Sequence, residues 1–231
     1  MNFKYQCVVL GHSGNFELSE SNSFILNRDT YDQQFHHIEA KYNSAEKLVY
    51  LTNLPSNTGE FSKDTAIKIQ VSLKTRGALC TLGLSLSKLN EFLPILVVPF
   101  NSQCCYSVET FITNMSEQNF DAGIIGFDST ERLYSYVRQQ KGEILEVAEK
   151  EVIGSFATAG IFYFRNRQTL INCINWSLMN RVTRNGLYYV APALNSIITS
   201  GGKIGLFEIL EKDYTRINLG GMQQKGHHGD L

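Results

Sequence analysis

Short apolar runs alternate with longer mixed segments along the first part of the chain. Two of these runs, residues 7–10 and 23–26, are bounded by Gly, Ser and Asn, so buried strands are predicted there. Residues 31–42 mix aromatic and charged side chains and are expected to form a helix, and the apolar run 47–51 is expected to form a third strand. Residues 53–63 are rich in Asn, Ser, Pro and Gly, which predicts a loop.

The next segments combine a glycine turn, a helix and a fully apolar strand. Leucines at 79, 82, 86 and 89 recur at helical spacing after Gly77, so a helix is predicted over 79–89. The run 94–99 is apolar throughout, which is typical of a strand inside a parallel sheet. Ligands of open α/β sheets bind beyond the carboxyl ends of such strands. The carboxyl end of this predicted strand leads into residues 100–103.

Further along, a helix over 108–118 and a strand over 122–127 complete another strand-helix-strand repeat. The pattern then changes to short strands separated by turns such as Lys141-Gly142, which predicts a mixed or antiparallel section. Strands are expected in this part of the chain at 133–137, 144–147, 159–164 and 203–209, and helices at 167–179 and 191–199.

The alternation through residue 127 predicts an α/β sandwich around a mostly parallel sheet, to which the later segments add a mixed section. We expect one domain over residues 1–220, without internal repeats. The polar, glycine-rich tail at 221–231 is expected to be flexible.

Composition and charge narrow the classes of partner. With 231 residues, 43% of them hydrophobic and 19% charged, the chain has the composition of an ordinary globular protein with a sizeable core. A net charge of -1 and the lack of any Lys or Arg run give no general attraction to nucleic acid or to anionic membranes. No apolar stretch approaches the roughly 20 residues of a membrane span, and no secretory signal is recognised, so a cytoplasmic location is expected.

The five cysteines indicate reduced thiols and no zinc site. Their number is odd, two of them are adjacent, and no pair has the C-x-x-C spacing. They are Cys7, Cys80, Cys104, Cys105 and Cys173. The adjacent histidines at 36–37 and 227–228 have no partner at a metal-ligand spacing, so metal binding there is not expected.

The first candidate chemistry is the acid-lysine pair Glu149-Lys150, which follows a predicted strand. A lysine ammonium can neutralise a phosphate as a point charge, and the neighbouring carboxylate can accept hydrogen bonds from sugar hydroxyls. With Glu146 and Glu151, the same residues could instead form a solvated charged turn. The pattern alone is compatible with both interpretations.

Three segments, taken in order, resemble the sugar nucleotidyltransferases, the enzymes that make nucleotide sugars, of the glucose 1-phosphate thymidylyl and capsular-sugar type. They are Val147-Ala-Glu-Lys150, Ala157-Thr-Ala-Gly160 and Asn185-Gly186, and the match, which also includes Ser135-Tyr-Val137, extends with gaps over residues 23–220. The resemblance implies a Rossmann-like three-layer α/β/α nucleotidyltransferase sandwich, GT-A-like, with a mixed central sheet.

The resemblance also implies roles for individual residues. Lys150 would contact the sugar phosphate, Glu149 and Gly160 the sugar hydroxyls, and Thr158 would support the same wall. The implied sugar-phosphate set is Glu149, Lys150, Thr158, Gly160 and Asn185, and the implied nucleotide set is Gly11, Gly14, Arg76 and Gly77. For Gly77, a backbone that reads the base edge and a glycine needed only to begin the helix are both consistent with the sequence.

Three departures from the family pattern predict impaired catalysis. The only candidate phosphate loop, Gly11-His12-Ser13-Gly14, lacks the arginine and the downstream lysine that hold a triphosphate. Residues 101–103 read Asn-Ser-Gln where the family has a metal-binding aspartate, so Mg²⁺ is expected to bind weakly if at all. Leu187 replaces a sugar-binding glutamate. Asp213 is the candidate for the second metal ligand, with Asn218 as the alternative.

The resemblance therefore implies a nucleotidyltransferase-like protein that binds a sugar 1-phosphate, a nucleotide or a nucleotide sugar with impaired catalysis, as a homo-oligomer or as the partner of an active relative. The alternative is an active, divergent transferase that couples a nucleoside triphosphate to a sugar 1-phosphate and releases pyrophosphate, for capsular or surface polysaccharide precursors. In that case Asp213, residues 11–14 or a partner subunit would replace the missing parts. A purely structural interaction role is also consistent with the sequence.

Overall fold

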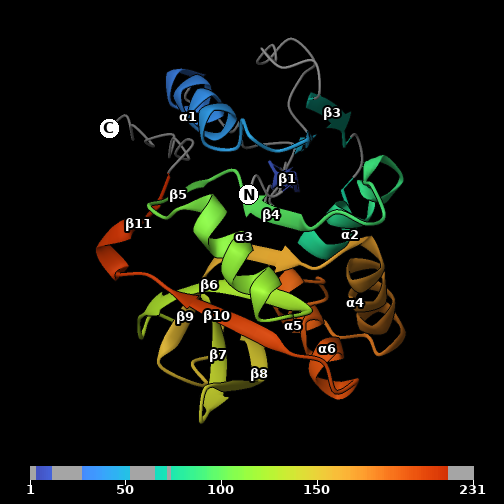
Figure 1. Ribbon diagram of the computed structural model, residues 1–231, viewed down its shortest axis with the longest axis vertical. Helices are drawn as coiled ribbons and strands as arrows, with labels where there is room; N and C mark the ends of the chain where they lie inside the picture. The colour runs from blue at the N-terminus through green and yellow to red at the C-terminus, as the bar shows by residue number, and fades with distance from the viewer. Residues whose placement is uncertain (1–3, 12–27, 53–65, 72–73, 218–231) are drawn as a thin grey trace, which may run out of the picture.

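A large mixed sheet organises the part of the chain that the structure describes. The computed structural model describes residues 4–11, 28–52, 66–71 and 74–217. Within these ranges nine strands belong to this sheet, and seven of them lie in the order β10-β6-β9-β4-β1-β2-β3 (Figure 1).

One half of the sheet is parallel. Its strands are β1 (Gln6–Leu10), β2 (Lys47–Thr52), β3 (Ala66–Gln70) and β4 (Ile95–Pro99). The two central strands, β1 and β4, are almost entirely apolar because both of their faces are covered. Val8 and Val97 pack into the core on one face, whereas Val9 and Val98 pack into the core on the other, as the alternation of a strand requires.

The other half of the sheet is mixed. Its strands are β6 (Ala122–Asp128), β7 (Ser135–Gln140), β8 (Glu143–Glu149), β9 (Phe156–Phe164) and β10 (Ile204–Glu208). β10 is parallel to β6, and β9 runs antiparallel between β6 and β4. β7 and β8 form a hairpin whose turn residues, Lys141 and Gly142, have φ values of 52° and 82°. Positive φ at both central residues is typical of a two-residue type I′ turn, so the predicted turn is confirmed.

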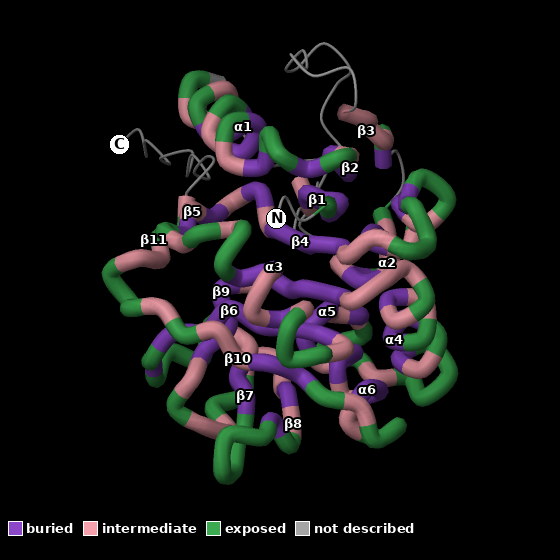
Figure 2. The backbone as a smooth tube through the Cα atoms, viewed as in Figure 1, coloured by how far each residue is buried: buried purple, intermediate pink, exposed green. Residues whose placement is uncertain are grey.

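Helices cover both faces of the sheet and complete three layers (Figure 1). One face carries α1 (Arg28–Lys41) and α3 (Val108–Glu117), and the other carries α2 (Ala78–Gly83), α4 (Arg167–Met179), α5 (Val190–Ala193) and α6 (Asn195–Thr199). Figure 2 shows the buried strands running through the middle of the molecule, with exposed positions on the helices and on the β7–β8 hairpin. The predicted three-layer α/β sandwich with a mixed central sheet is confirmed.

A small antiparallel ribbon follows the end of β4. In it, β5 (Ser102–Cys104) pairs with β11 (Tyr214–Arg216), which follows a 3₁₀ turn, η2 (Glu211–Asp213). The sequence pattern did not indicate β3, β5 or β11, because none of them is an apolar run and two are only three residues long. Their strand conformation depends on partners that are distant in the chain.

Two predicted helices are interrupted. The helix predicted over 79–89 ends at Gly83, where the hydroxyl of Ser85 hydrogen-bonds a carbonyl of the last turn at 2.7 Å and the chain continues as a 3₁₀ turn, η1 (Leu86–Lys88). The helix predicted over 191–199 is divided at Leu194, whose amide bonds the carbonyl three residues back at 3.1 Å.

The remaining predicted elements in the described ranges are confirmed with small shifts at their ends, and the strand predicted from residue 133 begins at Ser135. The strand expected at 23–26, the loop at 53–63 and the tail at 221–231 lie outside the described residues. None of the helices in the described ranges is long and apolar enough to cross a membrane.

Candidate functional site

The parallel strands end together at one edge of the sheet, which we call the carboxyl edge. β1 has β2 on one side and β4 on the other, so the strand order reverses between β1 and β4. Ligands of open α/β sheets bind at such a reversal. The amide of Gly11 donates to the carbonyl of Leu51 at 2.8 Å, and the amide of Phe100 donates to the carbonyl of Leu10 at 3.1 Å, so the three strands stay paired up to their ends.

The end of β8 and the start of β9 lie at the same edge. β6 runs parallel to β4, because both are antiparallel to β9, and Phe127 near the end of β6 pairs with Ala157. β7 also pairs with β9 at Ala157, and Glu149 at the end of β8 pairs with Ser135 at the start of β7. The topology therefore places Glu149 and Lys150 at the carboxyl edge.

Glu149 is a half-buried carboxylate with a hydrogen-bond donor beside it. The hydroxyl of Ser135 donates to Glu149 Oε2. Burial raises the pKa of Glu149, whereas the Ser135 hydrogen bond and the charges of Lys150 and Arg184 act in the opposite direction. The side chain is thus an acceptor held in a poorly solvated position.

Lys150 makes the turn between β8 and β9. Its φ is 54°, and its amide donates to the carbonyl of Tyr134 at 3.0 Å. Its ammonium nitrogen lies 5.5 Å from the ring centroid of Tyr189, within range of a cation–π interaction. The lysine is therefore backed by an aromatic ring at the edge where a ligand is expected.

The alternative of one solvated charged turn does not describe these residues. Glu146 pairs with Arg138 at 2.6 Å and Glu151 pairs with Arg184 at 3.5 Å, and these four side chains are 42–61% exposed. Glu149 and Lys150, which lie between the two glutamates, are half-buried. The outer residues are solvated ion pairs, and the inner two pack against Ser135 and Tyr189.

Two consecutive tyrosines connect the implied nucleotide set with the implied sugar-phosphate set. The amide of Tyr188 donates to the carbonyl of Arg76 at 2.8 Å, and the carbonyl of Tyr188 accepts from the amide of Leu79 at 3.1 Å. The guanidinium carbon of Arg76 lies 5.4 Å from the ring centroid of Tyr188, and the next residue is the Tyr189 that contacts Lys150. Arg76 and Lys150, 74 residues apart in the sequence, are thus held by neighbouring residues.

Gly77 is buried beneath the backbone of Tyr188. Its φ is 109°, and a Cβ atom built there would lie 2.3 Å from the carbonyl oxygen of Tyr188. The close approach of the two backbones requires a glycine. This supports the interpretation that the glycine is needed to begin α2, and the base contact of Gly77 stays a prediction.

Asn185 and Gly186 form a tight turn. Their φ values are 51° and 74°, and Arg184 and Leu187 exchange two backbone hydrogen bonds of 2.9 and 3.0 Å across the turn. This is the geometry for which Asn-Gly is the preferred dipeptide, so the turn alone accounts for both residues. The Asn185 side chain is exposed, and its implied role in sugar-phosphate binding stays a prediction.

Three other implied residues lie in or beside the sheet. Thr158 is 4% exposed and pairs with Gly126 on β6. Gly160 has a φ of 73° at the place where the β6–β9 register shifts, and a Cβ there would lie 3.4 Å from Pro99 at the end of β4. Gly11 follows β1 directly, and Gly14 lies outside the described residues.

The loop after β4 offers poor ligands for Mg²⁺. Asn101 is half-buried, and its carbonyl accepts from the amide of Ile217 at 2.8 Å. Ser102 is 8% exposed, and the side-chain amide of Gln103 donates to Gln34 Oε1 at 2.9 Å. Mg²⁺ prefers anionic oxygen ligands, which these side chains do not provide.

Asp213 lies at the far end of the β5–β11 ribbon. Its carbonyl accepts from the amide of Cys105 at 2.7 Å, whereas Arg216 is the residue opposite Ser102. Across the described ranges, no group of three or more His, Cys, Asp or Glu side chains could hold a metal ion. The donors that the described residues offer at this edge therefore do not fit Mg²⁺, and the assignment of Asp213 as a ligand gains no support. Asn218 lies outside the described residues.

Gln34 of α1 positions the loop after β4, and the sequence analysis did not identify it. It is 1% exposed, and its Nε2 donates to the carbonyls of Phe100 at 2.8 Å and Ser102 at 2.9 Å. A glutamine in a mixed helical segment does not reveal a partner loop 66 residues away.

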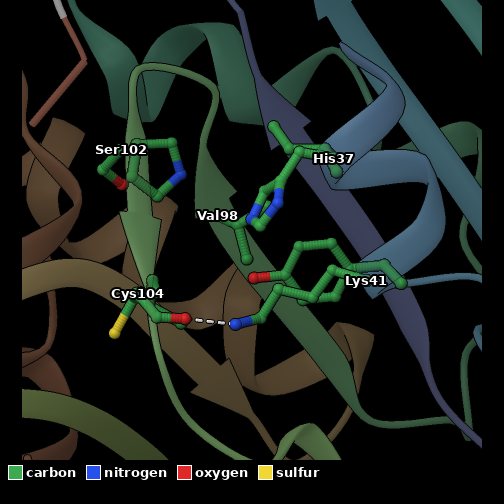
Figure 3. A pocket seen from close by; sticks show the side chains of 9 residues that line it. His37, Lys41, Val98, Ser102 and Cys104 are labelled. Carbon is green, nitrogen blue, oxygen red and sulfur yellow. Dashed lines mark hydrogen bonds between the residues drawn. The ribbon is translucent and has the colours of Figure 1, made fainter. Parts of the chain in front are cut away.

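A small cavity lies between α1 and the start of β5. Figure 3 shows His37, Lys41, Val98, Ser102 and Cys104 around it, with the ammonium of Lys41 donating to the carbonyl of Cys104. The cavity holds no more than a water-sized molecule. Burial lowers the pKa of His37, and the charge of Lys41 lowers it further. This cavity is too small for a nucleotide or a sugar.

Asn195 holds β8 from the side opposite β7. Its Nδ2 donates to the carbonyl of Val147 at 2.8 Å, and its Oδ1 accepts from the amide of Val147 at 2.9 Å. The side chain thus pairs with β8 as a neighbouring strand would, two residues before Glu149. The partner of Asn195 is 48 residues away and could not be read from the sequence.

Replacing Asn195 with alanine is expected to destabilise the protein by about 1–3 kcal/mol, because both backbone groups of Val147 lose their partner. Thermal unfolding would measure the loss, and amide exchange at Val147 should accelerate. Asn175→Ala, at an exposed asparagine of α4, is the control and should change neither property. Unchanged exchange at Val147 in the Asn195 variant would contradict the role given to this side chain.

Replacing Glu149 with glutamine is expected to stabilise the protein at neutral pH. Folding raises the pKa of this carboxyl group, so the group contributes its full stabilisation of the folded state below its unfolded pKa of about 4.3. That stabilisation is lost as the pH rises through the folded pKa. Glutamine keeps an oxygen acceptor for Ser135 without burying a charge. The melting temperature of the variant should exceed that of the native protein at pH 7 and match it near pH 4. Glu151→Gln, at an exposed site, is the control, and its melting temperature relative to the native protein should not depend on pH in this way. A Glu149→Gln variant that is less stable than the native protein at pH 7 would contradict the burial argument.

No protein-family model and no curated protein matches the sequence of this chain. Several hundred solved chains match its fold, among them the following three. A nucleoside-diphosphate-sugar pyrophosphorylase from Vibrio cholerae RC9 is 13% identical, with a TM-score of 0.72 over 91% of this chain and 94% of that chain.

The two other structures are similar in extent. A Bacillus anthracis protein described as a glucose-1-phosphate thymidylyltransferase, in complex with sucrose, is 12% identical, with a TM-score of 0.62 over 89% of this chain and 87% of that one. A CMP:2-keto-3-deoxy-manno-octonic acid synthetase complexed with CTP is 11% identical, with a TM-score of 0.60 over 90% of each chain. At these identities the likeness shows the fold alone, which this chain shares with all three proteins.

Proposed function

We propose that this chain binds a sugar 1-phosphate, a nucleotide or a nucleotide sugar at the carboxyl edge, and that nucleotidyl transfer is impaired. The observation that carries the proposal is the contact of Tyr188 and Tyr189 with both implied residue sets, at Arg76 and at Lys150. One ligand could therefore span the two sets.

The chemistry of the side chains suits an anionic, hydroxyl-bearing ligand. The ammonium of Lys150 neutralises a phosphate, and the carboxylate of Glu149 accepts hydrogen bonds from sugar hydroxyls. Because both side chains are half-buried, and Lys150 also lies beside the ring of Tyr189, their interactions are screened less than those of solvated ion pairs. Thr158 and Gly160, on β9, belong to the same proposed wall.

Impaired catalysis is proposed because the loop after β4 lacks a carboxylate. Nucleotidyl transfer by in-line attack places charge on the α-phosphate in the transition state, and a metal ion normally stabilises that charge by several kcal/mol. Asn101, Ser102 and Gln103 do not supply such a metal site. A homo-oligomer, or a complex with an active relative, is the proposed setting in which a binding protein of this kind would act.

The alternative is an active transferase that couples a nucleoside triphosphate to a sugar 1-phosphate. The names of two of the structures that share the fold favour it, a nucleoside-diphosphate-sugar pyrophosphorylase and a glucose-1-phosphate thymidylyltransferase. It predicts magnesium-dependent release of pyrophosphate, with the missing ligands supplied by residues outside the described ranges or by a partner subunit.

A thermal-shift panel tests the proposal. Nucleoside triphosphates, sugar 1-phosphates and nucleotide sugars would each be added with and without Mg²⁺, because a ligand that binds the native state raises its melting temperature. We expect stabilisation by sugar phosphates or nucleotide sugars that does not depend on Mg²⁺. Stabilisation by a triphosphate only with Mg²⁺, together with pyrophosphate release, would support the active transferase, and no stabilisation by any compound would overturn both.

A further inference from the structure

One face of α1 carries three polar side chains opposite the segment 100–104, which begins at the carboxyl edge and includes β5. Their spacing of three and four residues places them on one side of the helix, and they are Gln34, His37 and Lys41. Gln34 donates to the carbonyls of Phe100 and Ser102. Lys41 donates to the carbonyl of Cys104, so α1 holds the segment at two points, and His37 lies between them on the helix face.

The ring of His37 is directed into the cavity between α1 and β5. Figure 3 shows this ring and the ammonium of Lys41 pointing into the same space. The Nε2 atom of His37 is buried, and no described residue forms a hydrogen bond with it. From β4 and β9 the cavity is lined by Val98, Pro99 and Ile161, which carry no charge. The surroundings therefore suit the neutral form of the ring.

The titratable groups that line the cavity offer no negative charge to an imidazolium. Besides His37 they come from α1 and β5, and they are Lys41, Tyr42 and Cys104. Burial raises the pKa of the Cys104 thiol to about 12 and raises the pKa of the Tyr42 phenol well above its ordinary value, so both groups are neutral at physiological pH. The remaining group is the ammonium of Lys41. Among the described residues, no Asp or Glu lines the cavity.

Protonation of His37 is therefore unfavourable while α1 stays packed on the segment. Burial lowers the pKa of His37, because an imidazolium would lose hydration in the cavity, and repulsion by Lys41 lowers it further. A water molecule would fit the cavity and could hydrogen-bond the ring, but it would not neutralise the charge. The ordinary pKa of histidine is about 6.5, so the proton is taken up in the physiological range once the ring is solvated.

We propose that His37 is a pH-sensitive switch whose protonation releases the segment 100–104 from α1. Separation of the helix from the segment exposes the imidazolium and the ammonium of Lys41 to water, which screens their repulsion. The carbonyls held by Gln34 and Lys41 are freed in the same movement, because all three side chains share one helix face. Since the segment begins at the carboxyl edge, mild acid loosens that edge. This inference goes beyond the proposed function, because it concerns the protein without a ligand.

Melting temperatures of the full chain between about pH 7 and pH 5 test the switch. A histidine whose pKa is lowered by folding stabilises the folded state fully above its unfolded pKa of about 6.5, and this stabilisation is lost as the pH falls through the folded pKa. Glutamine cannot be protonated, so the melting temperature of His37→Gln should fall by at least about 2 °C less than that of the native protein. An equal fall in both proteins would overturn the switch.

His36→Gln is the matched control, because His36 is the adjacent residue of α1 and its side chain is exposed. This variant should lose as much melting temperature between the two pH values as the native protein does. If His36→Gln were protected from acid as well as His37→Gln, the effect would come from removing any histidine, and the cavity would not be its origin.

Proton NMR of the native protein locates the effect and does not depend on the stability of any variant. The ring of His37 should titrate below the ordinary value of about 6.5. Over the same pH range the side-chain amide of Gln34 should lose its protection from exchange, whereas the backbone amides of β1 should keep theirs. A His37 ring that titrates at or above the ordinary value, or a Gln34 amide that stays protected after the ring is protonated, would overturn the inference.

Discussion

Replacing Lys150 with alanine is expected to weaken the binding of sugar phosphates and nucleotide sugars about tenfold to hundredfold. The ammonium is the positive group of the implied sugar-phosphate set, and it is half-buried against Tyr189. A charge-assisted hydrogen bond to phosphate contributes about 1.5–3 kcal/mol, which corresponds to this range of affinity. Titration calorimetry on ligands selected by the thermal-shift panel would measure the dissociation constants.

Lys141→Ala is a closely matched control for this experiment. Lys141 has a φ of 52°, and Lys150 has a φ of 54°, so both substitutions place alanine in the same left-handed conformation. The two lysines lie at opposite ends of β8, and Lys141 is exposed in the hairpin turn. The control variant should bind ligand with the native affinity. Its melting temperature should change by about as much as that of Lys150→Ala. Equal affinities for Lys150→Ala and the native protein would refute the site assignment.

Replacing Gly77 with alanine is expected to cause the largest loss of stability, about 3 kcal/mol or more. A Cβ atom would lie 2.3 Å from the carbonyl oxygen and 2.7 Å from the amide nitrogen of Tyr188, and neither backbone atom can move without breaking its hydrogen bond. The φ of 109° is also unfavourable for alanine. In a chain of this size, we expect the melting temperature to fall by about 6–12 °C.

Gly186→Ala separates the clash from the backbone strain. Gly186 has a φ of 74°, but nothing lies within 4 Å of its added Cβ, so only the conformational cost of about 1–2 kcal/mol applies. Both glycines belong to the segments that Tyr188 joins. A similar loss in the two variants would mean that the contact with Tyr188 is not decisive. Since Tyr188 precedes Tyr189, the Gly77 variant should also bind ligand less well than the Gly186 variant.

Much of the fold follows from local pattern. The apolar runs that became β1, β2, β4 and β6 are long enough to show burial on both faces, so their strand assignment needs no tertiary information. The hairpin turn at Lys141-Gly142 and the tight turn at Asn185-Gly186 also follow from local sequence, because their positive φ values depend on the turn residues themselves. The strand-helix alternation predicted an α/β sandwich, and the family resemblance carried by Glu149-Lys150, Gly160 and Asn185 implied the same fold class, which the structure confirms.

The candidate site was predictable only in part. The sequence indicated four candidate residues that lie near the loop carrying Tyr188 and Tyr189. They are Arg76, Gly77, Glu149 and Lys150. It could not show that Gly77 is required by a backbone contact, because Tyr188 is 111 residues away. Gln34 and Asn195 gave no local signal of the contacts they make, since a polar residue in a helix is ordinary until its partner is known.

By itself, therefore, the sequence determined the strands, the main helices and the tight turns. The kind of ligand that an acid-lysine pair suits stays a prediction. Tertiary structure decided which of these elements are neighbours. It inserted β9 antiparallel between β4 and β6, and it brought β11 against β5. Hydrophobic burial and local backbone preference are readable from neighbouring residues. The contacts that build the site join segments far apart in the chain, so they exist only once the sheet has formed.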